Sequence, residues 1–230
     1  MIYTNFDYKD FHNIILRNNK KVLFVILTGY SRCGKDTAAS MLRDKLVKEK
    51  NLLNKEVAIR PLAFTIKKIV SKLFNIKMEL LEKIKNDNLP VCFGFDVKSV
   101  REILNNCGKV INEEFNVIKG SNYFVNEIVT TAFDTSINRD LKIVIIPDMR
   151  FKNEMKTFLE WEKAYPNNIY TLVVKVKSNL RTCIKVPGID DEVDEIVSDF
   201  TITVKENDYE SIDKQLNNIL FFIENSFKIL

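Results

Sequence analysis

The residues best suited to chemistry lie in one short, glycine-containing segment. Residues 29–37 read GYSRCGKDT and match the pattern G-x-x-x-x-G-K, with Asp36 where serine or threonine usually follows. Glycines let a backbone turn tightly and present N–H groups to phosphate oxygens. Lys35 adds a mobile positive charge for the β- and γ-phosphates of a nucleotide. The segment therefore predicts a loop that binds a nucleoside triphosphate through Gly29, Arg32, Cys33, Gly34, Lys35, Asp36 and Thr37.

Asp36 bears on how this loop would hold a metal ion. The hydroxyl that usually stands at this position binds Mg²⁺, but a carboxylate is also a hard oxygen ligand, directly or through water. A negative charge suits the first turn of a helix, and Thr37 offers a hydroxyl one residue later. The sequence leaves open which of the two side chains faces the metal or the phosphates.

A second candidate site follows an apolar run, Ile143 to Ile146. Ligand sites in parallel sheets form at the carboxyl ends of the strands, so we expect Asp148 near the glycine loop as a carboxylate associated with Mg²⁺. The alternative is that Asp148 caps a helix, where aspartate is common. Arg150 follows closely, and its planar guanidinium suits the phosphate of a substrate.

The elements that must position these residues alternate between strands and helices. Apolar runs predict strands over 22–27, 57–64, 143–146, 170–176 and 200–204. Helical spacing predicts helices over 37–50, 66–74 with 77–85 as an extension, 100–104, 110–115, 123–133, 153–161 and 212–227. This alternation predicts an α/β fold of three layers, a mostly parallel central sheet with helices on both faces. We expect residues 1–21 to be an extension, 22–230 one domain, and 177–194 a long loop.

Composition limits the class of protein. The 230 residues, 46% of them hydrophobic, suffice for one core. A net charge of +4 with the two signs interspersed suits phosphorylated small molecules better than nucleic acid. The longest apolar run, 22–27, is too short to span a membrane. Four cysteines without a CxxC pair and a single histidine disfavour a zinc site and are typical of reduced thiols in the cytoplasm.

Several segments together resemble the deoxynucleoside monophosphate kinases of viral and phage type, a branch of the P-loop kinases. Residues 34–37 look like that family's GKDT, and 148–154 are similar to its D-x-R-F-x-N-E segment. Weaker matches are 63–67, where Thr65 replaces a proline, the R-E-L-L-like residues 101–104, the acidic pair Asp194 and Glu195, and Asn207 with Asp208. The family usually continues G-T-x-x-x-R after R-E-L-L, whereas 109–115 contain no arginine.

The resemblance implies a three-layer P-loop kinase fold and transfer of the γ-phosphoryl group of ATP to a deoxynucleoside monophosphate (dNMP), giving the diphosphate with Mg²⁺. It implies that Lys67, Arg101 and Arg150 face the acceptor phosphate. Arg181 and Lys185 would be charges of a lid that excludes water, or else solvated loop residues. A base pocket needs aromatic or amide side chains, and Phe93 and Tyr123 are candidates. The implied catalytic set is Lys35, Asp148, Arg150 and Arg181, with Asp36, Thr37 and Asp148 at the metal.

Other functions remain open at this point. Phosphomevalonate kinase of animal type also carries G-K-D, and Pro187 to Asp191 resemble its late P-G-V-D-D segment. A non-catalytic nucleotide-binding switch would use the same loop, while a nucleic-acid-binding protein has only the mild positive charge in its favour. The sequence does not decide which bases are accepted or whether the chain forms a homodimer. It is consistent with a protein of the cytoplasm, or of the host cytoplasm if the protein is viral.

Overall fold

The computed structural model describes residues 15, 20–84, 99–119, 122–134, 138, 140–179, 182–206 and 208–227. These residues form two compact units, one from Met1–Pro61 with Glu127–Leu230 and the other from Leu62–Asn126. Of the expected extension, only Ile15, Lys20 and Lys21 are among the described residues. None of the helices in the described part of the chain combines the length and the apolar character needed to cross a membrane.

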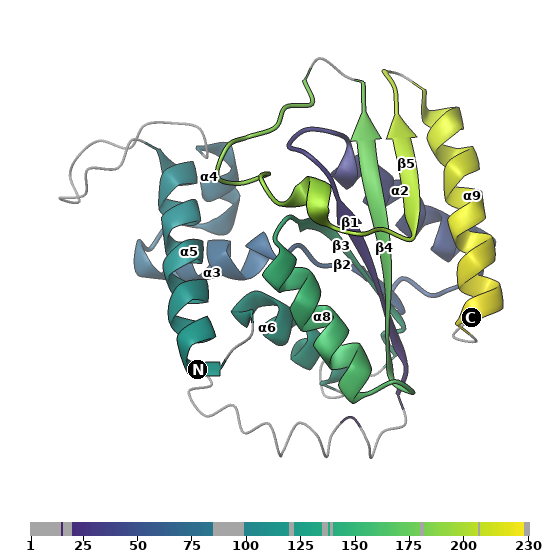
Figure 1. The fold of residues 1–230 in the computed structure, drawn as a ribbon, viewed down its shortest axis with the longest axis horizontal. Coiled ribbons are helices and arrows are strands. Elements are labelled where there is room, and N and C mark those ends of the chain that lie inside the picture. The colour runs from purple at the N-terminus through teal and green to yellow at the C-terminus, as the bar shows by residue number, and fades with distance from the viewer. Residues whose placement is uncertain are drawn as a thin grey trace. The chain divides into compact units, whose positions relative to one another are not determined.

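The first unit is built around a five-stranded sheet in which every pair of neighbours is parallel (Figure 1). Its strands are β1 (Val22–Thr28), β2 (Val57–Ile59), β3 (Ile143–Met149), β4 (Ile169–Ser178) and β5 (Phe200–Val204). The order β2-β3-β1-β4-β5 places β1 at the centre. All seven residues of β1 are buried, which explains the unbroken apolar run over 22–27. The glycine loop therefore starts between the carboxyl ends of β3 and β4.

Helices cover both faces of this sheet. Leu23, Val25 and Leu27 of β1 join one core with side chains of α2 (Lys35–Glu49) and α9 (Tyr209–Ser226). Side chains alternate along a strand, so Phe24 points to the opposite face, where its ring lies 5.6 Å from that of Phe158 in α8 (Lys152–Ala164). Figure 1 shows α8 and α2 on opposite sides of the strands. The predicted α/β class with three layers is confirmed.

The second unit is helical. It contains α3 (Ala63–Leu73), α4 (Met78–Lys83), α5 (Val100–Lys119) and the start of α6 (Tyr123–Phe133), inside which the boundary between the units falls. Its core is formed by buried apolar side chains of α3, α4 and α5, namely Val70, Leu81, Val100, Ile103 and Leu104.

Two predicted elements of this region were wrong. Residues 100–104 and 110–115 belong to one helix, α5, and not to two helices separated at Gly108. A Cβ atom on Gly108 would lie 2.8 Å from Cδ1 of Ile66, so the glycine allows α3 to approach α5 closely and does not end the helix. Residues 77–85 do not extend α3, because α4 is a separate helix.

Strand bounds also differ from the prediction. The strand expected over 57–64 ends at Ile59, where pairing with β3 stops, and a helix begins at Ala63. In contrast, β3 continues beyond Ile146 through Pro147 and Asp148 to Met149. Residues 177 and 178, expected in the long loop, pair with Thr203 and Val204 as the end of β4.

The Phe24–Phe158 contact yields a test of the core. Replacing Phe158, which is 0% exposed, with alanine leaves a cavity between α8 and the sheet. We expect the free energy of unfolding to fall by about 3–5 kcal/mol, measured by urea denaturation. The neighbouring residue Leu159 is 48% exposed and supplies the matched control. Leu159→Ala should cost about 1 kcal/mol or less, and equal losses in the two variants would contradict the assignment of this face.

Candidate functional site

The glycine loop joins the central strand β1 to helix α2, the strand–loop–helix arrangement of a phosphate-binding loop. A Cβ atom on Gly29 would lie 2.3 Å from the carbonyl oxygen of Val176 and 2.8 Å from Sγ of Cys33. Gly34 is the N-cap residue of α2 and has φ +93°. As a glycine it has no side chain that could occupy the first N–H groups of the helix. The first N–H groups of α2 have no carbonyl one turn earlier, so they can meet an anion.

Lys35 folds back into its own loop. Its Nζ atom donates hydrogen bonds to the carbonyl oxygens of Gly29 at 2.7 Å and Tyr30 at 2.6 Å, and lies 3.8 Å from Sγ of Cys33. The side chain is buried, and burial lowers the pKa of the ammonium group. The Cys33 side chain also lies in the core, so only its backbone can face a phosphate.

The remaining loop residues fit a triphosphate with Mg²⁺. Arg32 is exposed and adopts the left-handed conformation, with φ +60°. Asp36 and Thr37 are exposed in the first turn of α2. Among the described residues, no three His, Cys, Asp or Glu side chains gather into a metal cluster. Mg²⁺ typically takes one or two carboxylates and completes its shell with water and substrate phosphates, which suits this set.

Asp148 lies beside the start of the loop. It is the penultimate residue of β3, and the next residue, Met149, is in register with Thr28 of β1. The hydroxyl of Thr28 is buried without a hydrogen-bond partner. The carboxyl ends of β1 and β3 thus form one edge, where the sequence predicted that Asp148 would be.

Arg150 is held at the glycine loop. Its Nη1 atom donates to Oγ of Ser31 at 3.0 Å and to Oδ1 of Asp190 at 2.9 Å. Its backbone N–H donates to Oε2 of Glu154 at 2.9 Å, and the N–H of Phe151 donates to the same oxygen at 3.0 Å. Burial raises the pKa of the Glu154 carboxyl to about 7. Both the backbone and the side chain of Arg150 are therefore fixed.

The 182–194 segment, expected to be part of a lid, lies against the loop. The N–H of Ile184 donates to the carbonyl oxygen of Ser31 at 3.1 Å. The hydroxyl of Tyr30 donates to the Asp194 carboxylate, which raises the pKa of Tyr30 to about 12. The Nζ atom of Lys185 lies 5.8 Å from the centre of the Tyr30 ring. The loop and this segment are thus joined at several points.

The other predicted site residues belong to the second unit or lie outside the described residues. Lys67, Arg101 and Tyr123 belong to the second unit, on α3, α5 and α6. Phe93 and Arg181 lie outside the described residues.

Sequence reasoning missed three residues of the site, Ser31, Glu154 and Asp190. Glu154 was noted only within the segment 148–154; its carboxylate accepts the backbone N–H groups of Arg150 and Phe151, but a phenylalanine at the N-cap leaves no capping-box pattern in the sequence to reveal this. Asp190 was noted only within the segment 187–191, and Ser31 carried no signal beyond its place in the loop.

Comparison with known proteins gives limited guidance. Neither a protein-family model nor a curated protein matches the sequence. Two structures of the APS kinase CysC of Mycobacterium tuberculosis are similar to this chain, and each match covers 89% of this chain and 99% of CysC. The Cys556Ala mutant matches at 12% sequence identity with a TM-score of 0.43. The complex with AMPPNP and APS matches at 13% sequence identity with a TM-score of 0.46. The hexameric APS kinase from Thiobacillus denitrificans matches at 12% identity and TM-score 0.36, over 90% of this chain and 30% of that one. Identities and scores this low assign neither a family nor a substrate to this chain.

The close approach at Gly29 can be tested with alanine. Gly29→Ala would drive a methyl group into the Val176 carbonyl, so the loop must shift and lose contacts to the phosphates. A hydrogen bond to a charged group contributes about 1.5–3 kcal/mol, so the loss of one should weaken nucleotide binding by about ten- to a hundredfold. Titration with a non-hydrolysable ATP analogue measures this effect. The control is Gly188→Ala. Gly188 also has a positive φ, +75°, but a Cβ atom added there would meet nothing within 4 Å. That variant should bind the analogue normally, and unchanged binding by Gly29→Ala would contradict this loop geometry.

Glu154 predicts a pH dependence of stability. Its folded pKa of about 7 exceeds the ordinary 4.5, so between these values the folded protein keeps a proton that the unfolded chain releases. The free energy of unfolding should therefore fall as the pH rises through this window. Glu154→Gln carries no such proton and should lack this part of the decline. Urea denaturation between about pH 5 and pH 8 measures the free energy of unfolding of both proteins. The wild-type value minus the Glu154→Gln value should decrease as the pH rises and then level off. Parallel curves for the two proteins would rule out a shifted Glu154.

Proposed function

We propose that this chain is a Mg²⁺-dependent kinase that transfers the γ-phosphoryl group of ATP to the phosphate of a small acceptor, with a dNMP as the acceptor. The observation that carries the proposal is the meeting of two cations from different elements at one glycine loop. Lys35 lies inside the loop, and the guanidinium of Arg150 contacts Ser31 from the end of β3. A second cation beside the loop favours transfer between two phosphates, because it can neutralise the acceptor while Lys35 faces the donor.

The arrangement suits phosphoryl transfer in simple physical terms. Loop N–H groups and the start of α2 would hold the donor phosphates, and Lys35 would turn from the loop carbonyls toward them. Arg150 uses one terminal nitrogen for Ser31 and Asp190, while its side chain is 24% exposed. The remainder of its planar fork can therefore bind the acceptor phosphate and draw it toward the donor.

Mg²⁺ would neutralise the charge that develops on the transferring group, held by Asp36, Thr37 or Asp148. The acceptor is already an ionised phosphate, so the reaction needs no general base and depends on position and charge. The acidic side chains near the loop are thus better suited to binding a cation or orienting a neighbour than to removing a proton.

The choice of a dNMP depends on the segments 34–37 and 148–154, which resemble those of the viral and phage kinases. Within this proposal, Lys67 and Arg101 bind the acceptor phosphate, while Phe93 and Tyr123 contact the base. Arg181 and Lys185 act as lid charges, and the enzyme works in the cytoplasm.

One observation favours phosphomevalonate as a second candidate acceptor. Asp190 belongs to the segment that resembles P-G-V-D-D, and it is buried beside the loop and not in a solvated turn. A segment that resembles one of the phosphomevalonate kinases therefore lies beside the glycine loop. Both candidate acceptors carry a phosphate, so Arg150 would have the same role in each case.

The decisive assay offers ATP with dNMPs, ribonucleoside monophosphates and phosphomevalonate in turn. We expect a diphosphate product from a dNMP, and a loss of about 10²–10³ in kcat for Lys35→Ala, because the transferring charge loses a direct partner. Lys48→Ala, on the exposed side of the same helix, is the control and should keep full activity. Turnover of phosphomevalonate alone would show that phosphomevalonate, and not a dNMP, is the acceptor. Tight ATP binding without any acceptor-dependent turnover would instead support a nucleotide-binding switch.

A further inference from the structure

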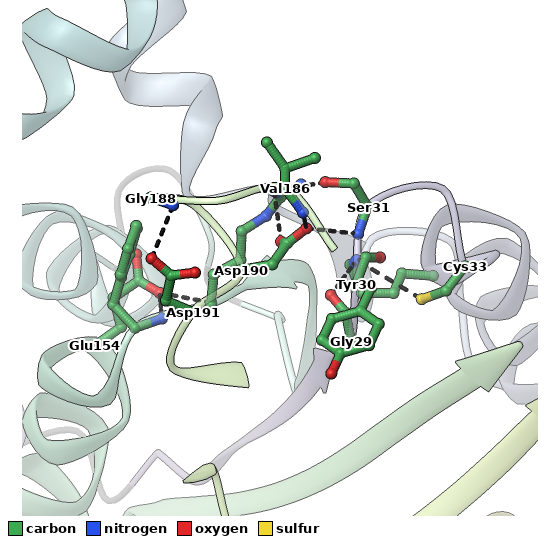
Figure 2. A network of polar contacts seen from close by, with 12 residues as sticks. Gly29, Tyr30, Ser31, Cys33, Glu154, Val186, Gly188, Asp190 and Asp191 are labelled. Carbon is green, nitrogen blue, oxygen red and sulfur yellow. Dashed lines mark hydrogen bonds and ion pairs between the residues drawn. The ribbon is translucent and has the colours of Figure 1, made fainter. Parts of the chain in front are cut away.

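The most unusual group near the loop is a buried carboxylate that the reaction does not consume. Asp190 is 0% exposed. Its Oδ2 atom accepts the N–H groups of Ser31 and Val186, each at 3.0 Å, and its Oδ1 atom accepts Nη1 of Arg150 at 2.9 Å (Figure 2). A buried charge is costly unless it is paired and hydrogen-bonded, and here both conditions are met.

These contacts join three parts of the chain that lie far apart in the sequence. Ser31 belongs to the glycine loop, Arg150 follows β3, and Val186 lies in the 182–194 segment together with Asp190 itself. We propose that Asp190 is a positioning residue: it holds the guanidinium of Arg150 against the glycine loop and fastens the 182–194 segment to the same place. Its effect on turnover rests on the kinase function proposed above.

The geometry explains why a fixed Arg150 matters. The residue is held through its backbone by Glu154 and through Nη1 by Asp190 and Ser31, so its cation is oriented before any substrate arrives. Preorganised charge lowers a barrier because it need not rearrange as the reaction proceeds. Without Asp190, Arg150 would lose its only anionic partner among the contacts described for its guanidinium.

Asp191 supplies a matched comparison on the adjacent position. Its Oδ2 atom accepts the N–H of Gly188 at 2.8 Å, a contact within its own turn. Figure 2 shows this carboxylate directed to Gly188 and not to Ser31. Asp190→Asn removes the charge that faces Arg150, whereas Asp191→Asn removes an equal charge that has no such contact.

The first experiment compares the two variants under the kinase assay. We expect Asp190→Asn to lower kcat by about a hundredfold, as for a reacting group displaced by an ångström. The KM for ATP should stay within about threefold, because the loop amides and Lys35 still hold the donor. Asp191→Asn should stay within about threefold in both constants. A full kcat in folded Asp190→Asn, or an equal loss in Asp191→Asn, would overturn the proposal.

The second experiment separates positioning from general damage. Asparagine keeps an oxygen that can accept the Ser31 and Val186 N–H groups, so Asp190→Asn removes mainly the charge that faces Arg150. If that charge acts through Arg150, its loss should cost nothing further once Arg150 is replaced, so Arg150→Met and the double variant should have the same kcat. Losses that multiply in the double variant would show that Asp190 acts on something else, and would sink the proposal. If Asp190→Asn does not fold, the same cycle is run with Asp190→Glu, which keeps the charge but moves it by one methylene group.

A third measurement is independent of turnover. Urea unfolding of the wild type, Asp190→Asn, Arg150→Met and the double variant measures the coupling between the two side chains. Coupling is expected, and purely additive losses of stability would overturn the contact itself. If the wild-type protein turns over no acceptor while this coupling is found, the kinase proposal fails and the link between Asp190 and Arg150 stands.

Discussion

The close approach of two backbones dominates this site. At Gly29 the chain leaves the central strand and passes so near the Val176 carbonyl of β4 that a side chain has no room. This contact exists because β1 lies between β3 and β4, with its end enclosed by both neighbours. The direction of the loop, the start of α2 and the position of Lys35 all follow from that turn. The sheet order therefore determines where the glycine loop lies.

Charge balance is the second constraint, and it depends on the first. The loop brings Lys35 into the interior, and the end of β3 brings Arg150 to the same edge of the sheet. Two cations this close repel each other, and the nearby Arg150 indeed lowers the pKa of Lys35 further. Asp190 supplies the compensating charge from the 182–194 segment, while Glu154 fixes the turn that carries Arg150. The acidic residues thus make the concentration of positive charge tolerable in the absence of a phosphate.

Much of this fold can be predicted from local patterns, because the patterns report burial. The strand 200–204 and the helix 123–133 were predicted with the bounds that the structure has, and the unbroken apolar run of β1 identified a strand covered on both faces. Gly108 misled the prediction because its role depends on Ile66, a residue of another helix. Asp190 was missed for the same reason: a proline-glycine-acid sequence is typical of a solvated turn, and only tertiary contacts bury it. The position of Asp148 and Arg150 at the same edge of the sheet as the glycine loop was predictable, since strand ends in a parallel sheet converge.

The separation of these partners along the chain has a consequence for how the protein folds. Ser31 and Asp190 lie 159 positions apart, whereas Arg150 and Asp190 lie 40 apart. Closing the longer loop costs about 1.2 kcal/mol more in chain entropy, since each doubling of length adds about 0.6 kcal/mol. During synthesis the glycine loop emerges long before the carboxylate that satisfies its Ser31 amide. Asp190 follows β4, so the Ser31 amide gains this acceptor only after four of the five strands have been synthesised.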